Sequence, residues 1–303
     1  MHTEVMTGVS HHILQMHPHA RITAYVPPHR SDVWPLFMQV HPSRHRVTVS
    51  RTLPRVVPPC DLVVITTARE KWALVPDQMV LRIKHVPSDQ GEIGLSPLVH
   101  TNHCLVSQVP WFQFYARNLR RGSPVVYVVG IEDWSMTEGS GVNRDLADLK
   151  LLVESSQVEV VLVARKLPDR YKLPGVTILQ NCSTEDLIHR LLTTNSYVWT
   201  CIQSGGVYHQ DRLTGCIPLA LSCRSKIITD AYTSHIYGNV TFDFVYRTTV
   251  TEIVDFLPSD HVPPAAPQPI ICDMFQYAVK TSSFFKHGAA YQPFGSNCPP
   301  DFV

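Results

Sequence analysis

The sequence contains no apolar run long enough to cross a membrane, and its first residues lack the apolar core of a secretion signal. Its 8 cysteines form no Cys-x-x-Cys pair. In a chain of 303 residues, scattered thiols beside apolar segments are typical of a reducing compartment rather than of a disulfide framework. We therefore expect a cytoplasmic protein without a transmembrane segment.

Neither sign of charge dominates the chain. The formal net charge is +1, and charged residues make up only 17% of the sequence. Because no global field would attract a polyanion, we expect no nucleic-acid partner. The hydrophobic content of 44% is that of an ordinary globular protein. The length suits two domains of about 150 residues each.

Two cofactor signatures are also absent. The 16 histidines include no His-Glu-x-x-His and no paired spacing of a zinc site. No Gly-x-Gly-x-x-Gly follows the first expected strand of either half, which disfavours a nicotinamide-dependent oxidoreductase. That alternative would be tested by titration with dinucleotides. We expect no cofactor.

The first half of the chain alternates between expected helices and strands. A helix is expected over residues 1–16, where apolar residues recur at helical spacing. The expected strands span residues 21–26, 46–50, 62–67, 79–85 and 103–107. Two further helices are expected, one capped by Asp32 and running through Val40, the other over 111–121. Such alternation indicates an α/β domain with a mostly parallel sheet. Since a doubly wound domain normally opens on a strand, this N-terminal domain, residues 1–121, is expected to lack its first strand.

The second half has the stronger pattern. Residues 125–130 form a continuous apolar run and 158–164 a near-continuous one, as in strands that parallel sheets bury. The order strand, helix, strand, strand, helix, strand, loop, helix, strand predicts a Rossmann-like sheet with right-handed crossovers. We assign residues 122–257 to this C-terminal domain. Its expected helices include 145–155, opened by Asn143 or Arg144, one capped by Ser183 or Thr184, and 249–257. Residues 258–303 are expected to form a proline-rich connector, a terminal helix and a tail.

A glycine-containing loop, Ser204-Gly205-Gly206, follows an expected strand and precedes a helix of small residues. At the carboxyl end of a parallel strand, unpaired backbone N–H groups and the positive end of a helix dipole favour anions. Glycine lets the backbone approach a ligand closely. The loop therefore either holds the phosphates of a nucleotide-linked ligand or uses glycine for turn geometry alone.

With these features the second half, best between Tyr127 and Thr229, resembles the C-terminal domain of GT-B fold glycosyltransferases. The resemblance implies two Rossmann-like domains that face each other across a cleft. It also implies donor contacts from the end of the first strand, a basic pair after the second, a helix start after the third and the glycine loop. The implied donor-binding residues are Gly130, Arg165, Lys166, Thr184, Glu185, Ser204, Gly205, Gly206, Tyr208 and Arg212.

One segment departs from the family pattern. Many retaining members carry a stretch that reads Glu-Ala-Met-Ala-x-Gly-x-Pro-Val-Ile. Here Leu219 stands in place of the glutamate, Arg224 in place of the glycine and Lys226 in place of the proline. The carboxylate that would hold the donor is therefore absent from this position. Either a diverged branch uses other contacts, or the protein has lost turnover.

The resemblance implies transfer of a sugar from a nucleotide-diphosphate donor to an acceptor hydroxyl, on a glycan or another molecule. Such a reaction needs a base if it inverts configuration. His85 ends an expected strand and Glu132 follows Gly130, so we take these two as candidate catalytic residues. No metal is implied, because the family neutralises phosphate with Arg, Lys and helix dipoles and no Asp-x-Asp lies near the expected site. The alternative is a catalytically degenerate GT-B-like protein that binds nucleotide or glycan.

Overall fold

The computed structural model describes most of the chain up to residue 257. The described residues are 2–26, 33–52, 54–66, 79–84, 92–94, 123–131, 143–156, 158–165, 167–210, 214–237, 240, 242–253 and 257. The strand expected at 103–107, the helix expected at 111–121 and all of 258–303 lie outside them. No helix in the described part of the chain is long and apolar enough to span a membrane.

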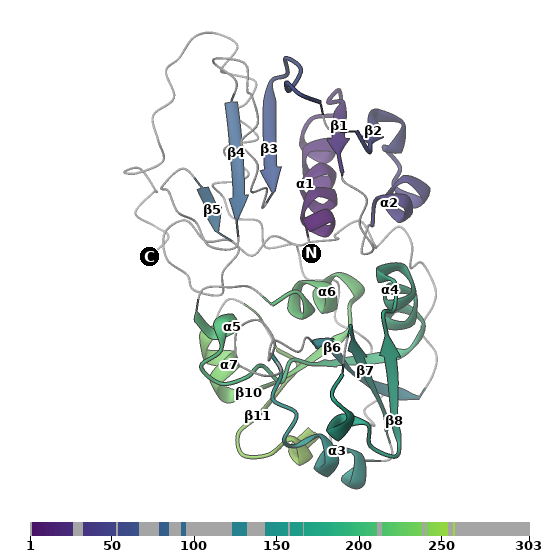
Figure 1. The fold of residues 1–303 in the computed structure, drawn as a ribbon, viewed down its shortest axis with the longest axis vertical. Coiled ribbons are helices and arrows are strands. Elements are labelled where there is room, and N and C mark those ends of the chain that lie inside the picture. The colour runs from purple at the N-terminus through teal and green to yellow at the C-terminus, as the bar shows by residue number, and fades with distance from the viewer. Residues whose placement is uncertain are drawn as a thin grey trace.

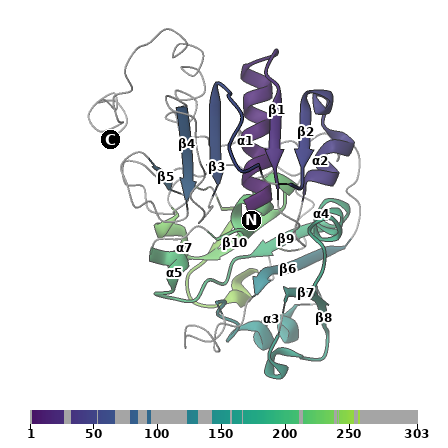
Figure 2. The same ribbon diagram turned by 45° about the horizontal axis from the view of Figure 1, so that its top comes forward.

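The N-terminal part opens on a helix, as predicted, and contains two small parallel sheets among its described residues (Figure 1). β1 pairs with β2, and β3, β4 and β5 form the other sheet. Helix α1 packs beside β3 (Figure 2). The elements are α1 (His2–Met16), β1 (Ile22–Tyr25), α2 (Trp34–Val40), η1 (Arg44–Arg46), β2 (Val47–Ser50), β3 (Leu62–Thr66), β4 (Met79–Lys84) and β5 (Glu92–Gly94).

The later part forms one six-stranded parallel sheet within the described residues, in the order β11-β10-β9-β6-β7-β8. This is the strand order of a Rossmann sheet, in which the chain winds outward first to one side and then to the other. The strands are β6 (Pro124–Ile131), β7 (Glu159–Ala164), β8 (Val176–Gln180), β9 (Asn195–Trp199), β10 (Lys226–Asp230) and β11 (Phe244–Tyr246). The predicted succession of strands and helices along the chain is confirmed as far as β10, whereas β11 was not predicted.

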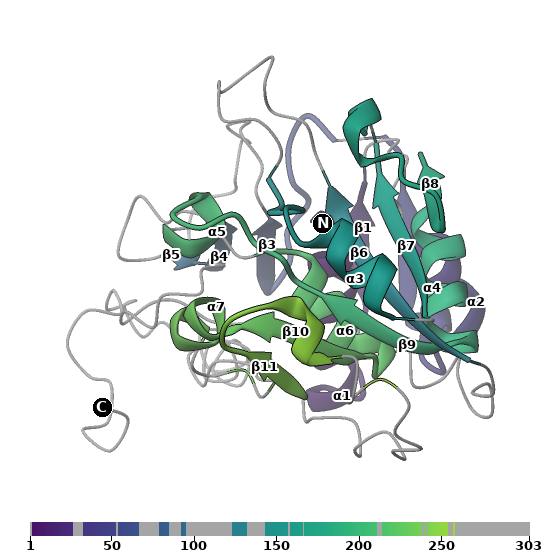
Figure 3. The same cartoon turned by 90° about the horizontal axis from the view of Figure 1, so that it is seen from below.

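Helices cover both faces of this sheet (Figure 3). The helical elements are α3 (Leu149–Ser155), η3 (Asp169–Tyr171), α4 (Thr184–Thr193), α5 (Val207–Gln210), α6 (Cys216–Cys223), α7 (Ala231–Ile236) and η4 (Val250–Ile253). Because side chains alternate along a strand, Val125 and Tyr127 of β6 pack on the face of α4 and α6. Val126 and Val128 pack on the opposite face with α3 and η4. Burial on both faces explains the continuous apolar runs.

Three expected helix boundaries were wrong. α2 begins at Trp34 without an aspartate cap, since its N-cap residue, Val33, makes no side-chain hydrogen bond. α3 begins at Leu149 rather than at 145, because the backbone N–H of Asp145 donates to the Cys201 carbonyl and holds that segment against the end of β9. The helix expected over 249–257 is a short 3₁₀ turn where it is described.

A buried histidine cluster joins α1 to the end of α2. The backbone N–H of Ser43 donates to Nδ1 of His41, so His41 carries its proton on Nε2 and donates it to Nδ1 of His11, at 3.0 Å. His12 lies next to His11 and is also buried. Burial lowers the pKa of His11 to about 3, with help from His12 and His41. It lowers the pKa of His12 and of His41 to about 4, and Arg46 adds to the shift of His41. All three rings are therefore neutral in the folded protein at pH 7.

This cluster predicts acid sensitivity. A histidine in the unfolded chain takes up a proton near pH 6.5, whereas these three stay neutral to lower pH when folded. Between pH 6.5 and pH 4 the unfolded state binds more protons, so the free energy of unfolding falls as the pH falls. Each histidine contributes up to about 1.4 kcal/mol per pH unit. Urea denaturation at pH 7, 6 and 5 measures the slope.

The variant His12→Leu should show a smaller slope, because it removes one of the three shifted groups. His45→Gln is the matched control, since His45 is exposed on η1. If the slope were the same in the wild type and in His12→Leu, the histidine cluster would not be the source of the acid sensitivity.

Candidate functional site

The carboxyl ends of the parallel strands lie at one edge of the six-stranded sheet. Along this edge the strand ends follow the order β10, β9, β6, β7, β8. The chain reverses its winding direction between β6 and β9, which pair directly. In an open α/β sheet, ligands bind in the crevice outside the strand ends at this reversal. The loops after β6 and β9 are therefore the expected ligand-binding loops.

Gly130 lies near the end of β6, where the register with β7 shifts between Val129 and Ile131. Its φ of 72° is in the left-handed region that side chains disfavour. A Cβ there would lie 3.5 Å from Nη2 of Arg144. The carbonyl of Gly130 accepts a hydrogen bond from Nδ2 of the buried Asn143, at 2.9 Å. The backbone conformation of the bulge therefore accounts for glycine here, because a Cβ would make only an ordinary contact with the arginine.

Arg144 is the charged group at the reversal point, and it is only 3% exposed. Its guanidinium donates through Nη2 to the Val129 carbonyl at 3.0 Å and to Oγ1 of Thr214 at 2.9 Å. Nε also donates to the Val129 carbonyl. Nη1 is buried, and no described residue accepts a hydrogen bond from it. A buried cation without a described carboxylate partner is costly, so the geometry favours an anion as its missing partner.

The glycine loop after β9 forms a tight turn. The backbone N–H of Gly206 donates to the Gln203 carbonyl at 3.0 Å, and Gly205 has a φ of 68°. A Cβ on Gly206 would lie 3.0 Å from that same carbonyl oxygen. Turn geometry therefore accounts for both glycines. Ser204 and Gly205 are exposed at the strand-end edge of the sheet, where a ligand can reach them.

Three residues fix the segment that follows the loop. The Arg144 guanidinium lies over the Tyr208 ring, 5.3 Å from its centroid. The Tyr237 hydroxyl donates to the Tyr208 carbonyl at 2.9 Å and accepts from the Thr214 N–H at 3.3 Å. Burial raises the pKa of Tyr237 far above its usual value, so the hydroxyl keeps its proton. The loop, α6 and α7 are thereby linked around Arg144.

A series of hydrogen-bonded side chains, Asp230, Thr233 and His209, begins at the end of β10. Asp230 caps α7 by accepting from the Thr233 N–H at 2.7 Å, and its other oxygen accepts from the Thr233 hydroxyl at 2.7 Å. Oγ1 of Thr233 lies 2.8 Å from Nε2 of His209, which is on α5. His209 is only 5% exposed, and the Tyr232 ring packs edge-on against it.

The structure brings together only some of the residues expected to bind the donor. Gly130 and Tyr208 lie beside Arg144, and the Ser204–Gly206 turn directly precedes the helix α5 that carries Tyr208. Arg165 is exposed at the tip of β7, one strand from Gly130. Thr184 and Glu185 begin α4 after β8, which is two strands, or about 10 Å, from β6. Lys166, Arg212, His85 and Glu132 lie outside the described residues, so their roles stay predictions.

Sequence reasoning missed Arg144, His209, Thr233 and Asp230 as site residues. Arg144 was expected only to open a helix, and the contact that makes it important is to Thr214, 70 positions later. Asp230 and Thr233 follow the last predicted strand in a helix-capping arrangement that the sequence could have revealed.

The departures from the family pattern have clear structural counterparts. Leu219 is 8% exposed and packs in the main apolar cluster, so no polar group replaces the missing carboxylate there. Arg224 follows α6 with a φ of 53°, the left-handed conformation that a glycine usually supplies at a helix end. The pattern therefore matches at this helix end, with arginine in the glycine position.

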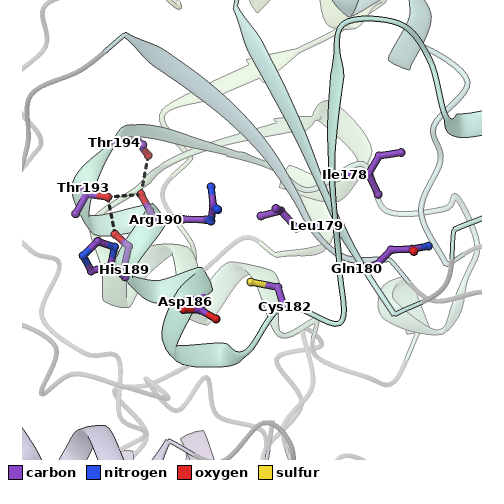
Figure 4. A pocket seen from close by; sticks show the side chains of 9 residues that line it. All are labelled: Ile178, Leu179, Gln180, Cys182, Asp186, His189, Arg190, Thr193 and Thr194. Atoms are coloured by element: carbon purple, nitrogen blue, oxygen red, sulfur yellow. Dashed lines mark hydrogen bonds between the residues drawn. The ribbon is translucent and has the colours of Figure 1, made fainter.

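A cavity of about 570 Å³ lies elsewhere, between β8 and α4 (Figure 4). Its lining includes Gln180, Cys182 and Arg190 but none of the predicted donor-binding residues. Within the described part of the chain, no three His, Cys, Asp or Glu side chains are grouped so as to hold a metal ion.

Comparison with known proteins shows a similarity of fold but not of sequence. No protein-family model matches the chain, and no curated protein matches its sequence. The structure is similar to the crystal structure of AviGT4, a glycosyltransferase involved in avilamycin A biosynthesis, with a TM-score of 0.55 and 12% identity. The match covers 95% of this chain and 91% of that chain. It confirms the predicted GT-B-like α/β fold, whereas the domain boundaries and the cleft stay predictions.

The Tyr237 contacts predict a stability effect. Tyr237→Phe removes the hydroxyl that pairs with the carbonyl of the half-buried Tyr208 and with the buried N–H of Thr214. We expect a loss of about 1–3 kcal/mol in the free energy of unfolding, measured by urea denaturation. Tyr232→Phe is the control, because Tyr232 is 50% exposed. Equal stability of the two variants would contradict the role given to Tyr237.

Proposed function

We propose that this protein is a glycosyltransferase that transfers a sugar from a nucleotide-diphosphate donor to an acceptor hydroxyl. The observation that carries the proposal is the buried Nη1 of Arg144, which has no hydrogen-bond partner in the described part of the chain and lies beside the segments after β6 and β9. The fold shared with AviGT4, itself described as a glycosyltransferase, supports the same class of reaction. The acceptor, a glycan or another hydroxyl compound, would approach from the N-terminal part of the chain.

The charge of a nucleoside diphosphate suits this edge of the sheet. A phosphate oxygen would take the hydrogen bond that Nη1 lacks, and Arg165 at the tip of β7 would add a second positive charge. The exposed residues Ser204 and Gly205 of the turn after β9 would face the phosphates from the other side. A nucleoside near Thr184 and Glu185 would extend along the edge toward β8.

In the proposed reaction the acceptor oxygen forms a bond to the anomeric carbon of the sugar. The bond between that carbon and the phosphate oxygen breaks, and the nucleoside diphosphate leaves with the electron pair. Negative charge therefore grows on the phosphate next to Arg144, where a fixed cation in a dry site stabilises it most. The acceptor proton passes to a base, for which His85 and Glu132 stay the candidates.

A second candidate function is donor or glycan binding without turnover. The buried position of Leu219 favours it, because the carboxylate of many retaining relatives has no polar substitute there. Release of nucleoside diphosphate from a bound sugar nucleotide, measured with and without added acceptors, separates the two functions. Binding without release would support the second.

The Arg144 contact predicts how donor affinity responds to mutation. Calorimetric titration with UDP, dTDP, GDP and ADP should show that at least one of them binds. That nucleoside diphosphate should bind more tightly than the corresponding nucleoside. Arg144→Met should weaken nucleoside diphosphate binding by about ten- to hundredfold, the value of a charge-assisted hydrogen bond. Nucleoside affinity should change little, because it makes no contact with the guanidinium.

Arg144→Lys, which keeps the charge but loses the planar donor set, should fall between the wild type and Arg144→Met. Arg190→Met is the matched control, since Arg190 is exposed and lines the separate cavity. Circular dichroism and urea denaturation would establish that each variant is folded. The proposal fails if no nucleoside diphosphate binds, or if the diphosphates bind no more tightly than their nucleosides.

A further inference from the structure

His209 presents a buried hydrogen-bond acceptor that no described residue satisfies. It is on α5, directly after the glycine loop, and its backbone N–H donates to the Gly206 carbonyl at 2.8 Å. The ring is 5% exposed. Nδ1 is buried and has no hydrogen-bond partner among the described residues.

The neighbouring groups determine which ring nitrogen carries the proton. A carboxylate only accepts, so the Thr233 hydroxyl gives its one proton to Asp230. The Thr233 oxygen must then accept from Nε2 of His209, which therefore carries the ring proton. Burial lowers the pKa of His209, and the Asp230 carboxylate opposes only part of that shift. Nδ1 is left with a free lone pair that can accept a hydrogen bond.

Arg144 and His209 have complementary unsatisfied hydrogen-bonding groups. Tyr208, whose ring lies under the Arg144 guanidinium, immediately precedes His209. Among the residues that the structure describes, Nη1 of Arg144 has no acceptor and Nδ1 of His209 has no donor. An inorganic anion would satisfy only the first. A ligand that carries a phosphate and, nearby, a hydroxyl group would satisfy both.

We propose that Nδ1 of His209 accepts a hydrogen bond from a hydroxyl of the sugar that the donor carries, and so distinguishes a sugar nucleotide from the bare nucleoside diphosphate. This assignment rests on the proposed function. Thr233 and Asp230 act as positioning residues, because they hold the imidazole in the tautomer that accepts. A buried acceptor left unpaired costs about 1–3 kcal/mol, which a sugar hydroxyl would recover on binding.

The test compares two affinities in each variant. UDP, dTDP, GDP and ADP and the glucose conjugate of each are titrated by calorimetry into the full-length wild type and into His209→Gln. The amide N–H of Gln can still reach Thr233 but offers no acceptor at the Nδ1 position. We expect the sugar nucleotide to bind about tenfold more weakly to His209→Gln, with less than about twofold change for the matching nucleoside diphosphate.

Two further variants sharpen the result. Thr233→Val keeps the side-chain shape but removes the oxygen that holds the His209 proton on Nε2. It should lower the affinity for the sugar nucleotide more than the affinity for the nucleoside diphosphate. His189→Gln is the matched control, since His189 is exposed beside the separate cavity. It should bind both ligands like the wild type.

The outcomes separate the two proposals. If the wild type binds none of the eight probes, the proposed function fails and the role of His209 fails with it. If nucleoside diphosphates bind but His209→Gln and Thr233→Val change both affinities equally, or neither, the role of His209 alone is overturned.

Discussion

One buried guanidinium connects the segments at the carboxyl-end edge of the six-stranded sheet. Arg144 joins the end of β6, through the Val129 carbonyl, to the start of α6, through Thr214, and it lies over the ring of Tyr208. Removing a cation from water is costly, and two neutral acceptors repay only part of that cost. The edge is therefore organised around a charge that its own described residues leave incompletely satisfied, which is a physical reason to expect an anionic ligand there.

The strand order explains why this interaction forms at this place. Winding outward from β6 in both directions makes β6 and β9 neighbours, although β7, β8 and the helices α3 and α4 lie between them in the sequence. Their following loops must then share one crevice. Arg144 follows β6 and Tyr208 follows β9, so the fold brings the cation and the ring together. The hydrogen-bonded series Asp230, Thr233 and His209 lies at the same edge, at the end of β10, the strand next to β9.

Divergence at α6 bears on mechanism more than on binding. Leu219 lies in the apolar cluster, and Arg224 adopts a left-handed conformation at the helix end. The helix therefore ends as the glycine-bearing pattern would, although no carboxylate stands at position 219. The proposed contacts of Arg144 with phosphate and of His209 with sugar do not involve that position. Under these proposals the missing carboxylate bears on turnover and not on binding.

The sequence by itself determined the order of elements, because hydrophobic periodicity is local: the apolar runs of β6 and β7, the Ser183 cap of α4 and the glycine turn after β9 were all predicted from neighbouring residues. It also predicted a ligand at the strand-end edge of the sheet, which stays a prediction. Only the tertiary structure decided which side chains meet there. Arg144 contacts Thr214 across 70 positions, and His209 contacts Thr233 across 24. Such contacts depend on crossovers between strands, which no local pattern of residues records.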